Sequence, residues 1–191
     1  MKEDDIKFAA LRLLSIRECP DFIHGTTAEV IETNRRFPIT LIYGLTRYIW
    51  NFATRHATLT TPEELVDQKY LYRYKMPEDF LYLRGQYLDR SEQAPLLNFE
   101  FNGKYLDTNA KQVFIRYTAK VPISEMPLHF TDYVAVRLAY DLCDVLTGDS
   151  ALKNTLFGEE RLAFLEAKNI DARQNPPRVF KSSPFVDVRR A

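Results

Sequence analysis

Residues 127–149 read PLHFTDYVAVRLAYDLCDVLTGD and decide the fold. Apolar side chains recur every three or four residues, as on one face of an α-helix, and proline favours the first helical position. A break at Gly148 ends this helix, and Asp149 is a good N-cap for a second helix that reaches about Gln174. The stretch therefore predicts a helical hairpin with an apolar face made of Phe130, Val134, Leu138, Leu142 and Val145.

The N-terminal part predicts two further helices. Residues 5–16 carry an amphipathic stripe, with Asp4 or Asp5 as the expected N-cap. A second helix is expected to start near Thr27 and to be interrupted by Pro38, because proline lacks the backbone N–H and crowds the preceding turn. The helical pattern resumes over residues 39–54.

Over residues 56–122 the apolar residues recur with a period of 2 instead of 3.6 residues, which indicates strands. The Asn102–Gly103 pair is typical of a two-residue type I′ turn, and it predicts a β-hairpin in which Phe99 faces Leu106. This block predicts a small antiparallel sheet inserted between helices.

These patterns together predict a mainly α protein. Residues 1–55 and 123–175 form the expected helical bundle, residues 56–122 the inserted β sub-domain, and residues 176–191 an extended C-terminal tail.

Composition excludes several classes of function. A formal net charge of zero argues against sequence-independent DNA binding as the main task. No window approaches the ~20 apolar residues of a membrane span, and the N-terminus has no apolar signal core, so we expect synthesis and folding in the cytosol. Cys19 and Cys143 are expected to be free thiols.

No catalytic, cofactor-binding or metal-binding pattern is apparent. His24, His56 and His129 lie in different predicted elements, and neither cysteine stands at ligand spacing from them. The neighbouring acid pairs point apart on a helix or strand, so they are poor acid–base dyads. Phosphate loops, serine elbows and Cys/His nucleophile patterns do not occur. We therefore expect a protein that is not an enzyme and binds no cofactor. Among the hypotheses about function, an enzyme that uses a cleft between bundle and sheet ranks last.

The polar, basic tail is the candidate binding element. A disordered terminus would explain its composition, but apolar anchors among its basic residues favour docking of an extended segment on a partner. The expected docking residues are Arg178, Val179, Phe180, Lys181, Phe185, Val186, Val188, Arg189 and Arg190.

The Tyr-rich segment of residues 70–90 offers an alternative function. Aromatic side chains interleaved with Arg and Lys can stack on the bases of single-stranded nucleic acid. The competing interpretation is a half-buried strand whose cations reach out to solvent.

The order of these signals resembles the head-to-tail adaptors of short-tailed bacteriophages, the tail tubular protein A family. The resemblance spans residues 7–190, and one departure is Phe185, where a larger aromatic residue such as Trp is expected. The matching segments are Trp50–Ala53, Tyr72–Leu81, Asn102–Gly103, Phe114–Tyr117, Met126–Phe130, Leu138–Ala139, Leu146–Asp149, Asp171–Gln174 and Val188–Arg190.

That resemblance implies a structural protein of the virion neck, assembled in the host cytoplasm. It implies a ring of twelve copies between the portal protein and the tail nozzle protein, with viral DNA passing through its middle. The C-terminal tail of each copy would reach onto the portal.

Overall fold

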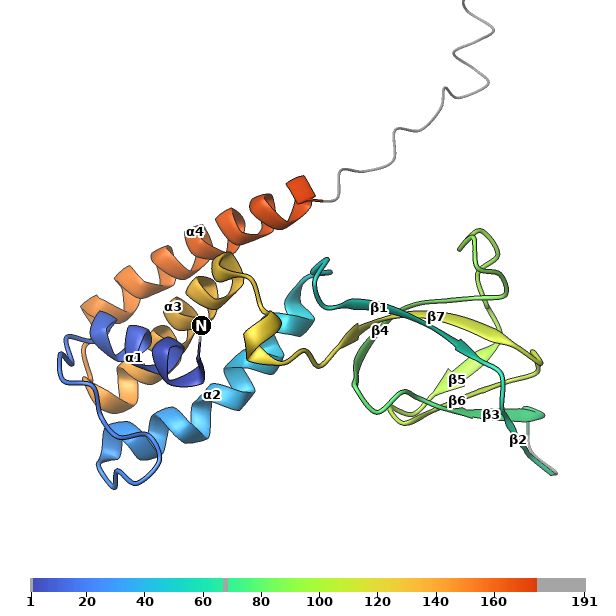
Figure 1. The fold of residues 1–191 in the computed structure, drawn as a ribbon, viewed down its shortest axis with the longest axis horizontal. Coiled ribbons are helices and arrows are strands. Elements are labelled where there is room, and N and C mark those ends of the chain that lie inside the picture. Colours follow the sequence, from blue (N-terminus) through green and yellow to red (C-terminus); the bar gives the residue numbers. More distant parts are fainter. Residues whose placement is uncertain (1, 67–68, 175–191) are drawn as a thin grey trace, which may run out of the picture.

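The computed structural model describes residues 2–66 and 69–174. In this part of the chain, four α-helices form one lobe and seven strands form another (Figure 1). The helices are α1 (Glu3–Leu13), α2 (Ala28–Arg47), α3 (Leu128–Leu146) and α4 (Ser150–Gln174), and a short 3₁₀ helix, η1 (Ile123–Glu125), precedes α3.

The expectation of a mainly α protein is wrong. Two antiparallel sheets make the chain a mixed α/β fold, with about 20% of it in strands. The strands are β1 (Thr54–Leu59), β2 (Glu63–Glu64), β3 (Tyr72–Lys75), β4 (Phe80–Tyr87), β5 (Phe99–Phe101), β6 (Tyr105–Thr108) and β7 (Val113–Ala119).

The two sheets enclose a core of their own. One sheet has the order β1–β7–β4 and the other β2–β3–β6–β5. Tyr74 and Leu106 from the second sheet pack with Ile115 and Tyr117 from the first. Each sheet therefore buries one face against the other.

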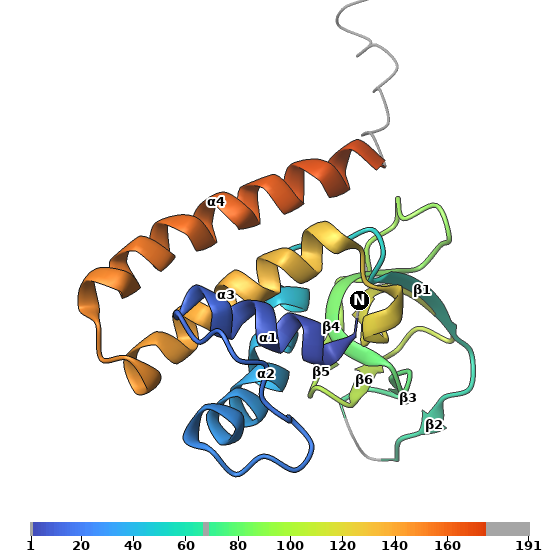
Figure 2. The ribbon, with the colours of Figure 1, turned by 60° about the vertical axis from the view of Figure 1, so that its left-hand side comes forward.

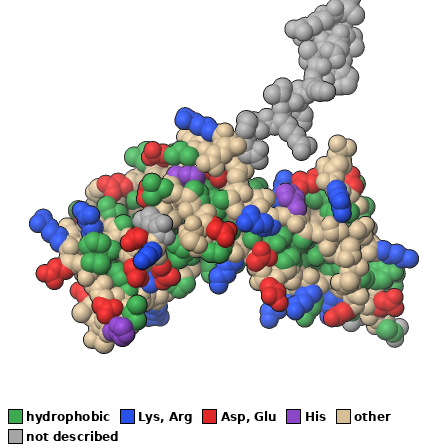
Figure 3. Space-filling view, in the orientation of Figure 1, with side chains coloured by type: hydrophobic (Ala, Val, Ile, Leu, Met, Phe, Trp, Pro, Cys, Tyr) green, Lys and Arg blue, Asp and Glu red, His purple; other side chains and the backbone are tan. Residues whose placement is uncertain are grey.

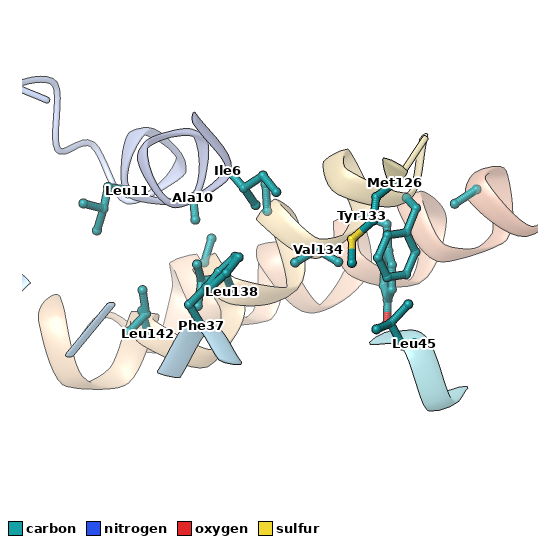
Figure 4. Close-up of a cluster of buried hydrophobic side chains, with 14 of the residues drawn as sticks. Ile6, Ala10, Leu11, Phe37, Leu45, Met126, Tyr133, Val134, Leu138 and Leu142 are labelled. Carbon is teal, nitrogen blue, oxygen red and sulfur yellow. The ribbon is translucent and has the colours of Figure 1, made fainter. Parts of the chain in front are cut away.

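Helix α3 is the centre of the helical lobe. It packs against α1, α2 and α4, which surround it (Figures 1 and 2). Figure 4 shows Leu138 and Leu142 of α3 meeting Leu11 of α1 and Phe37 of α2. Burial of this α3 stripe is the main stabilising term of the lobe, at roughly 1.5–3 kcal/mol for each large apolar side chain.

Helix α2 differs from the prediction at two points. It continues through Pro38 instead of breaking there, and it ends at Arg47 rather than near residue 54. The indole N–H of Trp50 donates to the carbonyl oxygen of Gly44 at 2.8 Å and so satisfies a carbonyl near the end of the helix. Trp50 itself is fully buried.

The predicted hairpin forms with a different register. Phe101, not Phe99, is the partner strand residue that faces Leu106, and Phe99 faces Thr108. The loop of residues 102–104 is one residue longer than a two-residue type I′ turn. The side-chain oxygen of Asn102 accepts a hydrogen bond from the Tyr105 amide at 2.9 Å across this loop. Gly103 supplies the positive φ of 88° that the loop requires.

The helix ends follow local capping chemistry. The Asp149 carboxylate accepts hydrogen bonds from the backbone amides of Ala151 and Leu152, which confirms the predicted N-cap of α4. Helix α1 instead begins after Lys2, whose amide donates to the Asp5 carboxylate at 2.8 Å.

Candidate assembly interface

Helix α4 presents an apolar outer face to solvent. It packs chiefly against α3, to which it contributes Leu156 and Ala167. Phe157, Leu162 and Leu165 point elsewhere and are 49%, 69% and 51% exposed. We call these three residues the α4 outer face. A long helix with large apolar side chains in water is a candidate for contact with another molecule.

Helix α2 has a comparable face on another side of the lobe. Phe37 and Gly44 face α3, whereas Ile31, Ile39, Ile42 and Tyr43 are exposed. We call these four residues the α2 outer face. Helices α2 and α4 lie on different sides of α3 (Figure 1), so the two outer faces belong to two different helices.

Buried ion pairs fix both helices to α3. Arg47 of α2 contacts Glu160 of α4, which is 2% exposed, and it also donates to the Tyr133 hydroxyl at 2.9 Å. Burial raises the pKa of Tyr133 to about 12. On the same side, the buried Asp141 carboxylate accepts from Arg36 at 3.2 Å and from Arg137 at 3.0 Å. Because a buried charge is costly without its partner, these pairs hold the relative positions of the three helices.

Aromatic rings cover the same arginines. The guanidinium of Arg47 lies 4.0 Å from the centre of the Phe164 ring, and that of Arg137 lies 4.5 Å from the Tyr43 ring. Stacking of this kind adds to the ion pairs. The helical lobe can therefore present its outer faces as a rigid block.

The two lobes are joined by a second set of polar contacts. Arg84 of β4 donates to backbone carbonyls at the end of α2 and to Thr118 of β7. The amide of Asn51 donates to both carboxylate oxygens of Asp171 at 3.1 Å, and the Asn51 side chain donates to the Asp171 carbonyl at 2.7 Å. Burial raises the pKa of Asp171, although the Asn51 amide opposes this.

The predicted docking residues of the tail lie outside the described residues, as does the whole of the predicted tail. They are Arg178, Val179, Phe180, Lys181, Phe185, Val186, Val188, Arg189 and Arg190. The chain leaves the described part at Gln174, the last residue of α4.

The Tyr-rich segment is divided between core and surface. Tyr70 and Tyr74 are buried, and the Tyr74 hydroxyl donates to the Ala110 carbonyl at 2.8 Å. Tyr82 is half-exposed, but Arg84 covers it at 4.5 Å from the ring centre. These rings do not form the continuous exposed platform that stacking on bases would use.

The histidines do not converge. His24 contacts Asp21, His56 contacts Glu92, and His129 lies in a cavity between α3 and α4. Among residues 2–66 and 69–174, no cluster of three or more His, Cys, Asp or Glu side chains could hold a metal ion. Both cysteines are free, Cys19 at the surface and Cys143 in the core. In the described part, no helix has the length and apolarity needed to cross a bilayer.

Surface charge shows no single-sign patch on the face drawn in Figure 3. Acidic and basic side chains are interspersed over both lobes, with apolar patches between them (Figure 3). No family model matches the sequence, and no curated protein does.

The buried acids are a structural feature that the sequence pattern could have revealed. Glu160 and Asp171 follow Leu156 at four and fifteen residues, so both fall on the buried stripe of α4. A carboxylate on such a stripe requires a buried partner. Nothing in the local sequence identifies Arg47 or Asn51 as those partners, because each is more than a hundred residues away.

Proposed function

We propose that this chain is a structural virion protein, a head-to-tail adaptor that forms a ring between the portal protein and the tail nozzle protein. The observation that carries the proposal is the pair of apolar outer faces on α2 and α4. The order of sequence signals along the chain also supports it, because it resembles the adaptor family.

A ring needs two different surfaces on each copy. A closed ring of identical chains is built from heterologous contacts, in which one surface of a copy meets a different surface of the next. The α2 and α4 outer faces fit this requirement, since they are two distinct surfaces on different helices of one lobe. Leu162 of one copy would then contact the α2 outer face of its neighbour.

The polar joint between the lobes suits a protein that bears load. Arg84 connects the β lobe to the end of α2, and Asn51, in the link between α2 and β1, is hydrogen-bonded to Asp171 of α4. Such contacts limit hinge motion between lobes. The formal net charge of zero suits a neck through which DNA passes without being held.

The tail would supply the contact with the portal. Its basic and apolar residues 178–190 give an extended segment the means to dock, and many copies in a ring would bind together by avidity.

Mixing the full chain with the portal protein encoded by the same genome tests this function. For the full chain, we expect sedimentation to show a stable complex that carries a ring of adaptors. A chain that ends at residue 175 should sediment as free protein, and its circular dichroism spectrum should be unchanged. Normal joining by the shortened chain would contradict the role of the tail, and absence of any complex with the full chain would contradict the proposed function.

A further inference from the structure

Two cavities adjoin on the face of the β1–β7–β4 sheet that points away from the core between the sheets. Along β7 the buried residues of that core alternate with Phe114 and Arg116, which therefore face the other way. Phe114 lines a cavity of about 250 Å³, and Arg116 lines a cavity of about 690 Å³. His56, Arg90 and Glu92 line both cavities, so the two form one continuous surface.

Aromatic side chains make one wall of the smaller cavity. Tyr87 of β4 is the strand partner of Phe114, so both rings leave the same face of the sheet. A Cβ atom on Gly85 would lie 2.4 Å from the Tyr87 hydroxyl oxygen, so the absence of a side chain at Gly85 lets the Tyr87 ring lie along its strand. A planar apolar group can stack against this wall.

A loop between β4 and β5 makes the opposite wall. The Leu88 amide donates to the Ala94 carbonyl at 2.8 Å, which closes the loop. Glu92 in this loop has a φ of 60°, which is unfavourable for a residue with a side chain. Its carboxylate contacts His56 Nε2 and Arg116 Nη1, each at 2.9 Å, and so ties the loop to the sheet. Strain that is maintained by such contacts is common at binding sites.

Both acids at this site already have hydrogen-bond partners. Glu92 is bonded to the sheet, and the Asp89 carboxylate accepts from the Ser91 hydroxyl and from the amides of Gln93 and Ala94. These bonds, that from Ser91 first, lower the pKa of Asp89, so its charge is retained and is already compensated. Neither acid is therefore free to recognise a cation.

The arginines at this site still have donors to offer. The Arg90 guanidinium lies 5.9 Å from the centre of the Phe114 ring, and no acid of the described residues forms an ion pair with it. Arg116 Nε is buried, and no described residue accepts a hydrogen bond from it. Because a buried donor without an acceptor is uncommon, Arg116 is a candidate for contact with a ligand. The charges thus favour an anion.

We propose that these cavities bind a small molecule in which a planar aromatic ring carries a negatively charged group, either a carboxylate or a phosphate. The ring stacks against Phe114 and Tyr87 in the smaller cavity, and Arg90 binds the anion where the two cavities meet. At about 250 Å³, the smaller cavity suits a single nucleobase or a small aromatic acid. This site is separate from ring assembly, because no residue of the α2 or α4 outer face lines it.

Calorimetric titration of the full chain tests this site with two aromatic anions, adenosine monophosphate and phenylacetate. Adenosine and phenylacetamide lack the charge, and inorganic phosphate lacks the ring. We expect at least one of the anions to bind about tenfold more tightly than its uncharged analogue and than phosphate, because a charge-assisted hydrogen bond is lost in the analogue. Binding of the nucleotide alone identifies a nucleotide as the ligand, and binding of phenylacetate alone identifies an aromatic acid. Failure of both anions to bind would overturn the proposal, as would equal affinity for anion and analogue.

Variants of the full chain locate the binding. Arg90→Gln should weaken binding of the anion about tenfold and leave the uncharged analogue unaffected. Arg161→Gln is the matched control, since Arg161 is also exposed and lies 5.8 Å from the centre of the Phe157 ring. Thr58 is exposed and lines the smaller cavity, so Thr58→Trp should fill the cavity and abolish binding with unchanged circular dichroism. Equal affinities in Arg90→Gln and Arg161→Gln, or binding that survives Thr58→Trp, would contradict this site.

Discussion

The guanidinium of Arg84 donates a hydrogen bond to the carbonyl oxygen of Thr46 at 2.7 Å. The same group reaches the Tyr48 carbonyl at 2.8 Å and the Thr118 hydroxyl at 2.8 Å. A side chain from the β lobe thus satisfies carbonyl groups at the C-terminal end of α2, where a positive charge is also favoured by the helix dipole. One residue therefore contributes both to the end of α2 and to the position of the β lobe.

Replacement of Arg84 should weaken the joint between the lobes. In Arg84→Lys the charge remains, but the planar fork that bonds three groups at once is lost. We expect unfolding to become easier by about 2 kcal/mol, from buried carbonyls left without donors. Urea titration followed by Trp50 fluorescence measures this, with the exposed Arg90→Lys as control; equal midpoints for both variants would contradict the capping role.

Loss of Arg47 should cost more than loss of the whole buried pair. In Arg47→Ala, the buried Glu160 keeps only a longer contact with Arg137 at 3.8 Å, and we expect a loss of about 3–5 kcal/mol. The double variant Arg47→Met with Glu160→Leu removes both charges and should recover much of that loss. Lys153→Ala, which breaks an exposed pair with Asp144, should cost only about 0.2–1 kcal/mol. If the double variant is no more stable than Arg47→Ala, burial of an unpaired charge is not the cause of the lost stability.

Asp171 should make stability depend on acid pH in a defined direction. Its burial raises the pKa above the ordinary 3.8, so the folded state favours the neutral carboxyl. The stabilising contribution of Asp171 is then present below about pH 4 and is lost as pH rises through the raised pKa. Asp171→Asn lacks this titration, so the unchanged chain should lose stability relative to the variant on going from pH 4 to pH 7. Parallel pH profiles of the unfolding free energy would rule this out.

Tyr117 and Tyr133 should be the last tyrosines to ionise. Burial raises the pKa of each to about 12, and a hydrogen bond with Asp79 contributes for Tyr117. Because the neutral phenol is favoured in the fold, their contribution to stability is lost as pH rises from about 10 towards 12. In an ultraviolet titration of the folded chain, Tyr133→Phe should remove one late-ionising phenol. An unchanged late phase in that variant would place the high pKa elsewhere.

The sequence predicted individual secondary-structure elements better than it predicted the proportions of helix and strand. Periodicity found the helix of residues 128–146 and the N-cap at Asp149, since both depend on local side chains. It underestimated the β lobe, because short strands such as β2 and β5 acquire their identity from partners distant in the sequence. Pro38 misled the prediction for a related reason: burial of Phe37 and Leu45 on both sides keeps α2 continuous.

The candidate site was less predictable than the fold. The docking residues proposed from sequence fall in the tail, beyond the described residues, whereas the α2 and α4 outer faces emerge only when α3 is seen to occupy their inner faces. The sequence does not show whether an apolar residue such as Leu162 lies in the core or at an interface.

The mass of the adaptor–portal complex tests the central claim most directly. Leu162→Glu and Ile39→Glu each place a charge on one outer face, so native mass spectrometry should show portals with a few separate adaptors instead of a filled ring, while the folded monomer is unchanged. Leu97→Glu, on a still more exposed leucine of the β lobe, should still fill the ring. Complete rings with both helix variants would contradict assembly through these two faces.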